Sequence, residues 1–506
     1  MKRNDSIIIF LVAVLLCICV ACMNKNNGVK KSKTNEVMKV GYELDVTNFD
    51  PTLSGSGGDH VIQWPIYDTL IRFDDKLDPL PGLVREWQLI NNKTIRLKLE
   101  ENVKFHDGTS FNATAVKINI ERMNSKESII RDLQNIKLVH VMSDFLVELQ
   151  LKKPDSSILM ALSDRGGMMV SPKAIANKNH NLSENPVGTG PFKFESREPN
   201  AEIIYTKNHT YWSEKEAKVE KLIIKVMADE NVRMNALRSG ELDFIIGISP
   251  TNIASFEKNN NFNIVGDVAS SFKVLFINAD LGIMKNKDIR LAMQYAINRD
   301  QLVQALNFGR GKAGHQVFSE KHWAYIDDFE IPYNPQKAKE HIKKSGVTDL
   351  QMTFTYYSKS YETRLAELLR TQLEMVGFKV KLEGMETVAA VNYFFGEKRG
   401  EVLVAEWTGR TDAQMAMFSL FSRDSFFNTG GNSTDEIEQL INEGASTNNK
   451  NKRKLVYEKI QKKAYFEEAI IIPIIFPPAM VAYNKKVVGY EANIYGKVLF
   501  SQLGFK

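Results

Sequence analysis

The sequence predicts an α/β protein with more than one domain, and three observations support this class. The chain has 506 residues, more than a single hydrophobic core usually serves, so two or three domains are expected. Its residues are 43% hydrophobic and 25% charged, as in ordinary globular proteins. From Val37 onward, short strand-like and helix-like segments alternate, and no repeat or low-complexity stretch interrupts them.

The first third of this part has the pattern of antiparallel α+β structure. Thr94–Leu99 alternates apolar and polar residues, which is typical of a half-buried strand. Leu138–Leu151 holds two apolar runs around Met142-Ser143-Asp144, which predicts a hairpin. Between these segments, Asn112 is suited to cap a helix over the sequence FNATAVKINIERM.

The later part of the chain predicts a parallel sheet. Strand-like runs alternate here with helical patterns, and such alternation implies parallel strands joined by right-handed crossovers. Ligands of open α/β sheets bind beyond the carboxyl ends of the strands, where the stretch EWTGRTDAQMAMF (Glu406–Phe418) lies. The predicted elements are the strands Met352–Tyr356, Lys379–Leu382 and Val402–Trp407 and the helices Glu362–Met375 and Val388–Phe395.

The N-terminus has the features of an export signal. Lys2 and Arg3 precede an unbroken apolar run, Ile7–Ala21, which is too short to span a bilayer comfortably. All three cysteines of the chain, Cys17, Cys19 and Cys22, fall at the end of this run. A disulfide framework in the exported part is therefore excluded.

Cys22 resembles the lipidated cysteine of a bacterial lipoprotein. It follows Val20-Ala21 and precedes the polar stretch MNKNNGVKKSKTNE, although Cys19 stands where such sites usually carry leucine. We expect residues 1–21 to be a lipoprotein signal peptide and residues 22–36 a flexible tether. The lipid would then hold the folded part at a membrane surface without crossing it. An ordinary signal peptide with incidental cysteines is the alternative.

Composition and motifs argue against several function classes. A formal charge of +5 is mild for this length, and no basic run interleaved with aromatics indicates nucleic-acid binding. We find no HExxH, GxSxG or Walker motif, and the eight histidines lack the spacing of metal ligands. The sequence therefore gives no reason to expect catalysis, a resident metal or another cofactor.

Two glycine-containing stretches read as turns rather than as catalytic motifs. In VKFHDGTSFNATAVK (Val103–Lys117), Asp107-Gly108 predicts a turn beside a half-exposed histidine. In NPVGTGPFKF (Asn185–Phe194), Pro191 lacks the backbone N–H that a phosphate-binding loop would need. This second stretch predicts a tight connection into a strand at Phe192–Phe194.

Taken in their order and separation, these two stretches resemble characteristic segments of the bacterial extracellular solute-binding proteins of family 5. That family includes periplasmic and lipoprotein receptors for oligopeptides, dipeptides, glutathione and nickel. The resemblance runs from about Val37 to the C-terminus with the motifs in family order. Further matches are TNFDP at Thr47–Pro51, KVLFINADLGIMKNKDIRLAMQYAINRDQLVQAL at Lys273–Leu306 and IIPIIFP at Ile471–Pro477.

The resemblance implies a two-lobed periplasmic-binding-protein fold of type II, cluster C, that closes over its ligand around a hinge. An extra α+β domain would be inserted in lobe one. Because the chain would cross between the lobes more than once, the hinge is expected near Ser271 and Tyr483. The implied division is 37–72, 189–271 and 484–506 for lobe one, 73–188 for the inserted domain and 272–483 for lobe two.

The resemblance also implies an anion contact at Arg410. In family receptors that bind peptides, a carboxylate in the loop corresponding to EWTGRTDAQ often pairs with the ligand's amino terminus. Here Arg410 stands at or beside that position, and WTGRTD is more similar to the WSGR-x-D pattern of the glutathione branch. A helix beginning near Ala413 would favour negative charge at the same place. An internal salt bridge of Arg410 is the alternative.

The neighbours of Arg410 each have two readings. Trp407 would be an aromatic wall of the cleft or a core residue. Asp412 would contact the ligand or cap the helix Ala413–Phe421. We expect Met415, Phe418 and Phe421 to be core residues of that helix.

The stretch LSGSGGDH (Leu53–His60) corresponds to the family's segment that lines the cleft from lobe one. Its glycines, among them Gly57, would let backbone groups approach an extended ligand closely, and Ser56 and Gly57 are expected to bind the ligand. Asp59 would supply the partner for the ligand's amine that Arg410 no longer provides. The alternative is a glycine-rich loop whose Asp59 caps the following helix.

We therefore expect a lipid-anchored monomer on the outer face of the bacterial cytoplasmic membrane. It would capture a short peptide or a peptide-like anion and deliver it to a permease driven by an ATPase, without performing chemistry itself. A nickel or metal-chelate receptor of the same family is one alternative. A surface lipoprotein that senses peptides or acts as an adhesin is the other.

Overall fold

The computed structural model describes residues 36–54, 57–214, 217–257 and 261–506. The predicted signal peptide, Cys22, the tether up to residue 35 and Ser56 lie outside the described residues. Among those described, no helix is both long and apolar enough to cross a membrane.

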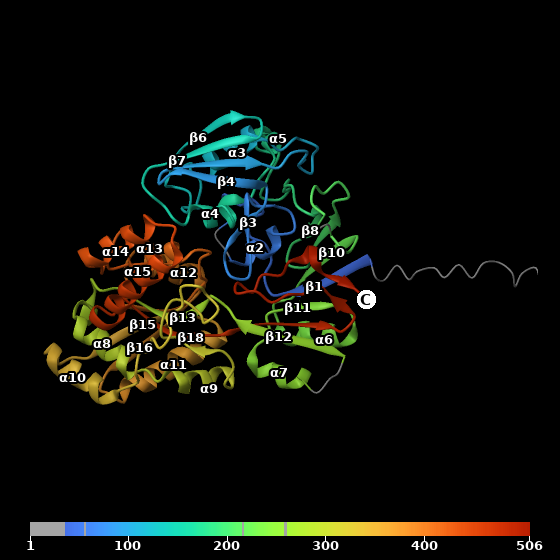
Figure 1. Cartoon of the computed structure of the whole chain (residues 1–506). Helices are drawn as coiled ribbons and strands as arrows, with labels where there is room; N and C mark the ends of the chain where they lie inside the picture. The colour runs from blue at the N-terminus through green and yellow to red at the C-terminus, as the bar shows by residue number, and fades with distance from the viewer. Residues whose placement is uncertain (1–35, 55–56, 215–216, 258–260) are drawn as a thin grey trace, which may run out of the picture.

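The described chain is built around three main sheets, and separate hydrophobic cores lie beside them (Figure 1). We name the part with the seven-stranded sheet lobe one, the part with the four-stranded sheet the inserted domain, and the part with the six-stranded sheet lobe two. In Figure 1 the inserted domain lies at the top, lobe one at the right and lobe two at the lower left. The orange helices of lobe two face the inserted domain.

Lobe one gathers strands from distant parts of the sequence. Its first strand is parallel to two neighbours and the remaining pairs are antiparallel. The strand order is β12 (Phe262–Val268), β19 (Pro478–Asn484), β11 (Phe244–Ile246), β1 (Val37–Tyr42), β10 (Lys221–Val226), β9 (Glu202–Lys207) and β8 (Phe192–Glu198). Its helices are α2 (Gly57–Gln63), α6 (Glu230–Ser239) and α7 (Pro250–Glu257), and β20 (Val487–Val488), η6 (Phe500–Gln502) and β21 (Gly504–Phe505) follow near the C-terminus.

The inserted domain confirms the antiparallel pattern of the sequence. The strand predicted at Thr94–Leu99 has those bounds, and Asn112 caps the predicted helix by accepting a hydrogen bond from the Ala115 N–H at 3.0 Å. The sheet order is β4 (Val84–Asn91), β5 (Thr94–Leu99), β7 (Leu146–Leu151) and β6 (Ile136–Ser143). The other elements are β2 (Ile71–Phe73), β3 (Pro79–Pro81), α3 (Ala113–Met123), α4 (Ile158–Ala161), η2 (Arg165–Gly167) and α5 (Pro172–Ala176).

Lobe two has a mixed sheet covered by helices on both faces. The predicted parallel pairing is right for β15 with β16 and β17, but β13 pairs antiparallel with both of its neighbours. The sheet order is β14 (Lys312–Ala313), β18 (Ile471–Phe476), β13 (Phe272–Ile277), β17 (Val402–Trp407), β15 (Gln351–Tyr357) and β16 (Lys379–Met385). The helical elements are η3 (Gly282–Lys285), α8 (Lys287–Ala296), α9 (Arg299–Asn307), α10 (Pro335–Ser345), α11 (Ser360–Glu374), α12 (Thr387–Val391), η4 (Asn392–Gly396), α13 (Ala413–Phe421), α14 (Asp435–Ala445), α15 (Lys450–Lys462) and η5 (Lys463–Glu467).

The chain passes between the two large sheets at two adjacent places. It leaves β12 of lobe one and enters β13 of lobe two through residues 269–271, as expected near Ser271. It returns from β18 to β19 at Pro477, whereas we expected this crossing near Tyr483, which lies within β19. Pro477 lies between the two strands and has no backbone N–H to donate to either ladder, whereas Pro478 already pairs with Val268 in lobe one.

The two glycine-containing stretches pack on each other and join the inserted domain to lobe one. His106 Nε2 lies 3.0 Å from the carbonyl oxygen of Gly190, and the His106 N–H donates to the carbonyl of Gly188 at 2.8 Å. Asp107 accepts from the Thr109 N–H at 3.0 Å, which confirms the predicted turn. These stretches are therefore structural in this part of the molecule.

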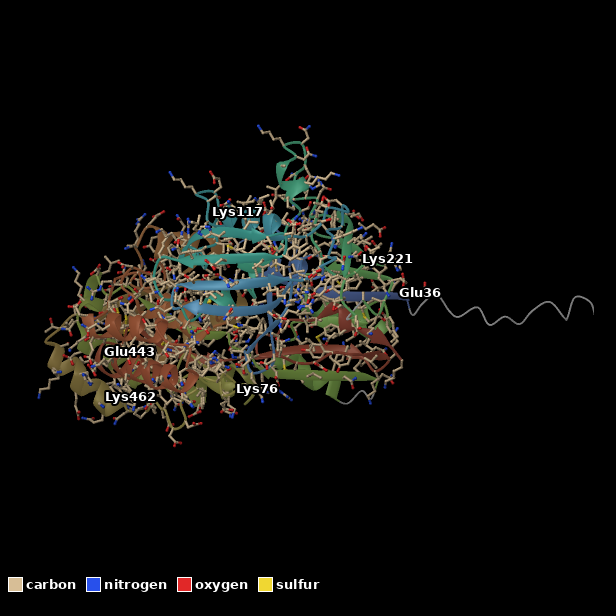
Figure 2. The ribbon with its side chains drawn as sticks, turned by 45° about the horizontal axis from the view of Figure 1, so that its top comes forward. Glu36, Lys76, Lys117, Lys221, Glu443 and Lys462 are labelled. Atoms are coloured by element: carbon tan, nitrogen blue, oxygen red, sulfur yellow. The ribbon has the colours of Figure 1, made fainter. Side chains whose placement is uncertain are left out.

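Charged side chains cover all three parts of the surface (Figure 2). Lys117 projects from the inserted domain, Lys221 from lobe one, and Glu443 and Lys462 from lobe two. Both signs of charge thus occur on the surface of lobe two, as the balanced composition suggests.

Buried histidines predict that the protein loses stability in mild acid. Burial lowers the pKa of His106 to about 4 and that of His322 to about 3. Both residues titrate near 6.5 in an unfolded chain, so between these values the unfolded state binds protons that the folded state does not. We therefore expect the free energy of unfolding to fall as the pH is lowered from roughly 7 to 5, measured by urea unfolding.

A His106→Gln variant should show a shallower dependence over the same range, because its amide can still donate to Gly190 but does not titrate. Equal slopes for the variant and the original protein would contradict this account of His106.

Candidate ligand-binding site between the lobes

The turn after β17 is shaped by its contact with the first crossing between the lobes. Gly409 has φ +75°, a conformation that favours glycine. A Cβ atom at this position would lie 2.7 Å from the Ser270 hydroxyl oxygen, so only glycine fits without movement. The turn therefore lies directly against the crossing, and the next residue, Arg410, points into the junction of the three parts.

The guanidinium of Arg410 is held by aromatic rings and forms no ion pair with the residues that the structure describes. Its central carbon lies 4.7 Å from the ring centre of Trp407 and 5.7 Å from that of Phe427. Its only hydrogen bond to a described residue runs from a terminal nitrogen to the carbonyl of Gly409 at 3.0 Å, and its Nε has no partner among them. The predicted alternative of an internal salt bridge is absent from the described residues, which contain no carboxylate within ion-pair distance of it.

Arg410 also connects lobe two to the C-terminal segment of lobe one. Its carbonyl oxygen accepts a hydrogen bond from the Tyr495 hydroxyl at 2.7 Å. Burial lowers the pKa of Arg410, while Asp132 and Asp164 of the inserted domain oppose this shift. These interactions place Arg410 where lobe one, lobe two and the inserted domain meet.

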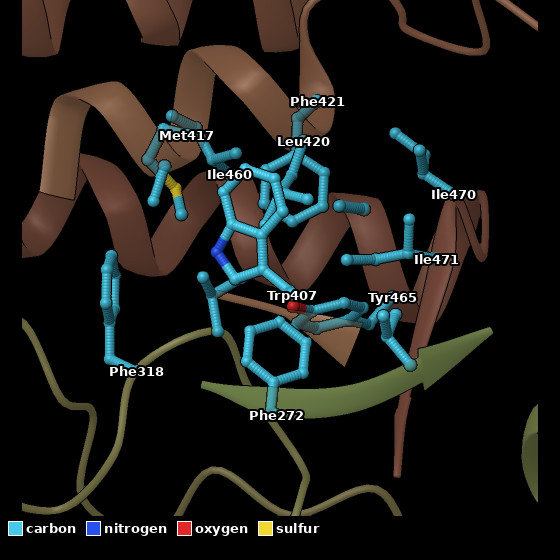
Figure 3. Packing of buried hydrophobic residues seen from close by; sticks show 14 of the residues in the cluster. Phe272, Phe318, Trp407, Met417, Leu420, Phe421, Ile460, Tyr465, Ile470 and Ile471 are labelled. Carbon is cyan, nitrogen blue, oxygen red and sulfur yellow. The ribbon is translucent and has the colours of Figure 1, made fainter. Parts of the chain in front are cut away.

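Trp407 lies beneath Arg410 in the core of lobe two. Its side chain is 2% exposed and packs edge-to-face on Phe427, with ring centres 5.1 Å apart. Figure 3 shows it among Phe272 of the sheet and Met417 of the covering helix. Of the two readings of Trp407, the structure matches the core residue, and its ring supports the guanidinium that lies over it.

Asp412 caps a helix and balances a buried charge. Its carboxylate accepts from the Gln414 N–H at 2.7 Å, and α13 begins at Ala413 as predicted. It also pairs with Arg453 of α15, and both side chains are 5% exposed. Burial raises the pKa of Asp412, and Arg453 opposes that shift. The helix-cap reading of Asp412 therefore describes this structure, since its acceptor capacity serves protein groups.

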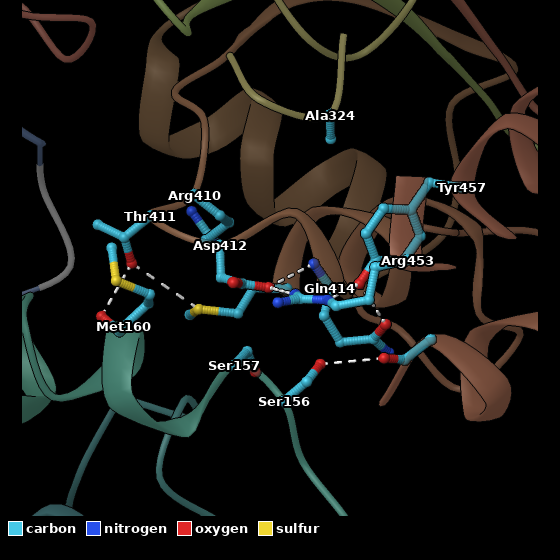
Figure 4. A network of polar contacts seen from close by, with 12 residues as sticks. Ser156, Ser157, Met160, Ala324, Arg410, Thr411, Asp412, Gln414, Arg453 and Tyr457 are labelled. Carbon is cyan, nitrogen blue, oxygen red and sulfur yellow. Dashed lines mark hydrogen bonds and ion pairs between the residues drawn. The ribbon is translucent and has the colours of Figure 1, made fainter. Parts of the chain in front are cut away.

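The network around Asp412 joins lobe two to the inserted domain (Figure 4). The Thr411 hydroxyl donates to the carbonyl of Met160 at 3.0 Å. The hydroxyl of Ser156 donates to the carbonyl of Gly444 at 3.0 Å. The backbone N–H of Ser156 donates to the carbonyl of Ala445, also at 3.0 Å. One segment of the inserted domain, Ser156 with α4 behind it, thus contacts both the turn before α13 and the end of α14. The helix residues Met415 and Phe418 take part in this contact, Met415 against the core of the inserted domain, rather than in the core of lobe two as expected.

The expected role of Asp59 does not fit the geometry. Its side chain is fully buried and accepts hydrogen bonds from the N–H and the hydroxyl of Thr47, both at 2.6 Å, and from the Ser54 hydroxyl at 2.9 Å. Gly57 begins α2, and Asp59 lies in the first turn of that helix instead of preceding it. Because this carboxylate is fully buried and bonds three protein donors, we infer that it holds the loop in place rather than meeting a ligand's amine.

The structure brings further charged residues to the junction that the sequence did not indicate. Asp164 Oδ1 lies 3.1 Å from His60 Nε2, and Asp164 Oδ2 lies 3.6 Å from the Lys497 ammonium. Arg165 reaches across to the carbonyl of Ser54 at 3.2 Å. The only signal in the sequence was the run Asp164-Arg165-Gly166-Gly167, in which charges precede a tight turn.

Metal ligation finds no support in the geometry. Across the described ranges no group of three or more histidine, cysteine, aspartate and glutamate side chains is arranged to hold a metal ion. Burial lowers the pKa of His60 well below its ordinary value, while Lys497 and other nearby cations lower the pKa of the Asp164 carboxyl. What the junction offers is therefore a set of organic cations and acids, which suits a charged organic ligand.

Known proteins share both the sequence pattern and the fold. The family model described as bacterial extracellular solute-binding proteins, family 5 Middle, matches residues 78–429. Over 473 residues the chain is 25% identical to the glutathione-binding protein GsiB of Escherichia coli O6:K15:H31, covering 90% of this chain and 91% of that relative.

Two solved structures have a similar fold. NikZ from Campylobacter jejuni, in complex with Ni(L-His), matches with a TM-score of 0.82 and 22% identity over 93% of this chain and 99% of its own. DppA from Helicobacter pylori, in complex with the peptide STSA, matches with a TM-score of 0.82 and 23% identity, over 94% of this chain and 100% of its own. These matches confirm the expected two-lobed α/β fold.

If Asp412 serves the fold, removing it should destabilise the protein strongly. An Asp412→Ala variant loses a helix cap and leaves Arg453 buried without a counter-charge, which should lower the free energy of unfolding by about 3 kcal/mol. Asp229 is a matched control, because it caps α6 through the Val232 N–H at 2.9 Å and forms no ion pair with a described residue. Asp229→Ala should lower that free energy by about 1 kcal/mol in the same urea titration. Equal losses in the two variants would contradict the role assigned to the buried pair.

Proposed function

Since the chain belongs to the bacterial extracellular solute-binding proteins of family 5, it is a receptor that captures a solute for an ABC importer, and we propose that this solute is a short peptide or a peptide-like anion. The receptor binds the solute and releases it, and its family consists of solute-binding receptors rather than enzymes. The relative that is 25% identical to this chain is named for binding glutathione, a small anionic peptide.

The unpaired guanidinium of Arg410 carries this proposal. A buried or half-buried arginine is normally paired, because leaving it without a counter-charge costs free energy. Arg410 is instead oriented by Trp407 and Phe427 and keeps its remaining donors free of described partners. A carboxylate of the ligand would accept these donors bidentately and supply the missing charge.

The position of Arg410 also explains why binding would favour closure. The residue belongs to lobe two, while Tyr495, which bonds its carbonyl, belongs to lobe one. A ligand held by Arg410 and by groups of the facing parts would be shielded from water when the lobes close. The same charge-assisted contact is stronger in that drier environment.

A ligand that contains a metal is a specific alternative to be tested. NikZ was solved with Ni(L-His), in which an amino acid that has a carboxylate accompanies the ion. An arginine that binds carboxylates would serve such a chelate as well. Native mass spectrometry of the purified protein, combined with measurement of bound metal, would separate a peptide from a chelate.

We place the receptor on the outer face of the bacterial cytoplasmic membrane, held there through Cys22, with an ABC permease and its ATPase as partners. The lipid anchor would keep a monomeric receptor close to its permease. The apolar run and the cysteine at its end support this placement.

Arg410→Ala should weaken binding of a carboxylate ligand by more than roughly tenfold, the loss of one charge-assisted pair. Isothermal titration calorimetry with a panel of short peptides that includes glutathione measures this, and thermal unfolding should be nearly unchanged. Arg423→Ala is the control, because Arg423 is an exposed arginine of the same lobe, paired with Asp435 at 2.6 Å. An unchanged dissociation constant for Arg410→Ala, or loss of its fold, would refute the assignment.

Cys22→Ser should release the protein from the membrane. If lipid on Cys22 is the anchor, the variant will be found in the soluble exported fraction after cell fractionation, while the original protein stays with the membrane. Substitution of Cys19 is the matched control and should leave the distribution unchanged. A Cys22→Ser protein that still sediments with membranes would show that another feature holds it there.

A further inference from the structure

We propose that the loop Asp74–Asp78 of the inserted domain is a latch that holds the lobes closed even when no solute is bound. The inserted domain has no direct chain connection to lobe two, because both of its ends run into lobe one. Contacts between the inserted domain and lobe two therefore form only when the lobes are close together. The inference goes beyond the proposed function and holds whichever solute the receptor carries.

The latch loop is a tight turn between two short strands. It connects β2 to β3, which pair antiparallel. The side chain of Asp74 closes the turn by accepting hydrogen bonds from the N–H groups of Lys76 and Asp78, at 2.9 and 2.8 Å. Leu77 has φ +60°, a conformation that leucine rarely adopts. Such strain persists only where surrounding contacts maintain it, so the packing of Leu77 must compensate for its backbone.

Leu77 is buried where the three parts of the molecule meet. Its side chain is 2% exposed and forms a small apolar cluster with Met160 and Ile494, which are 3% and 2% exposed. Met160 belongs to the inserted domain, and Ile494 belongs to the C-terminal segment of lobe one. Trp323 of lobe two packs against this cluster and also against the core of its own lobe. One cluster thus joins side chains of all three parts.

An ion pair next to Leu77 connects the latch loop to lobe two. The ammonium of Lys450, at the start of α15, lies 2.5 Å from the carboxylate of Asp78. The same ammonium lies 5.3 Å from the ring centre of Trp323. Both partners of the ion pair are partly exposed, so its own contribution is modest. The ion pair therefore orients a contact whose stability comes mainly from buried apolar side chains.

The latch lies beside the turn that carries Arg410. The ring of Phe73, the residue before the loop, packs edge-to-face on Tyr495 with ring centres 5.5 Å apart. Tyr495 bonds the carbonyl of Arg410, and the carbonyl of Met160 accepts from Thr411. The latch and a ligand carboxylate at Arg410 therefore favour the same arrangement of the lobes.

A latch of this kind increases affinity without touching the solute. It stabilises the closed state, and a solute leaves the closed receptor only after the lobes open. Removing the latch should therefore weaken the binding of every solute by the same factor and raise the dissociation rate. Selectivity remains with the residues that contact the solute.

Small-angle X-ray scattering of the solute-free receptor tests the latch directly. The exported protein would be freed of bound solute by unfolding and refolding, and native mass spectrometry would confirm that none remains. We expect its radius of gyration to match the value that the structure implies. Leu77→Gly and Lys450→Met should both increase it, because the first removes the buried side chain and the second removes the ion pair. Glycine adopts φ +60° without strain, so the turn itself is kept.

Two matched substitutions control for effects within a single lobe. Lys454→Met removes an ion pair of the same helix, because the ammonium of Lys454 lies 3.6 Å from Asp327 and both residues belong to lobe two. Asn200→Gly replaces an exposed residue with φ +59° in the turn between β8 and β9 of lobe one. Neither control should change the radius of gyration, and circular dichroism should show that all four variants are folded.

Binding measurements give a second readout. In calorimetry with glutathione and the other short peptides, Leu77→Gly should weaken every peptide that binds by one common factor, at least roughly threefold, and keep their rank order. Stopped-flow measurements should assign this loss to the dissociation rate.

The outcomes separate this inference from the proposed function. Equal radii of gyration for the original protein and its two latch variants would refute the latch while the peptide receptor stands, and so would a latch variant that changes the rank order of the peptides. If no peptide of the panel binds to the original protein, the proposed function is refuted, and the scattering comparison still decides the latch.

Discussion

The architecture depends on one long antiparallel ribbon that belongs to both lobes. β12 continues into β13 and β18 continues into β19, so the same two chain segments pair in each large sheet. The pairing stops only at residues 269–271 and at Pro477, where the ribbon changes sheet. Proline cannot donate to a strand ladder, so Pro477 adds no hydrogen bond to either sheet. We expect relative movement of the lobes to be concentrated at these crossings, since each ladder stays intact on either side of them.

Groups that determine binding are anchored close to this joint. Gly409 packs on Ser270 of the first crossing, and Arg410 follows it directly. On the other face of lobe two, Lys273 lies within 2.6 Å of both Glu362 and Glu406, and its side chain is 8% exposed. Burial disfavours the charge of Lys273, but the two carboxylates outweigh it and raise the pKa. This buried ion triad fixes the first residues of β13, so motion at the crossing does not spread into the sheet.

The sequence was most informative where local rules determine the structure. The cap at Asn112, the strand at Thr94–Leu99 and the helix over Ala413–Phe421 follow from side chains and neighbours in the chain, and all three were predicted with their observed bounds. The crossing at Pro477 was not predicted, because Pro473 lies within β18 and Pro478 within β19, so prolines alone do not mark where the chain changes sheet. Whether Asp412 caps its helix could be asked from sequence but not answered, since Arg453 lies far along the chain.

The rest of the site could not be predicted because it arises where three parts of the molecule meet. Lys497 stands in a short turn whose local sequence resembles an ordinary surface loop, and only the fold brings it to Asp164. For Asp59 the sequence suggested a contact with the ligand, because a carboxylate in a glycine-rich loop looks available. The fold instead gives this carboxylate hydrogen bonds from Thr47 and Ser54. A charged residue is available to a ligand only if the fold leaves it without protein partners.

The turn that carries Arg410 links the charge of the ligand to closure of the lobes. Within one turn of lobe two, the carbonyl of Arg410 bonds lobe one through Tyr495, and Thr411 bonds the inserted domain through Met160. These two contacts hold the turn in place, while the Arg410 guanidinium has no ionic partner among the described residues. A ligand carboxylate that pairs with it would be shielded from water between the three parts, where a charge-assisted contact is stronger. The charge that binds the ligand would therefore also favour the closed arrangement.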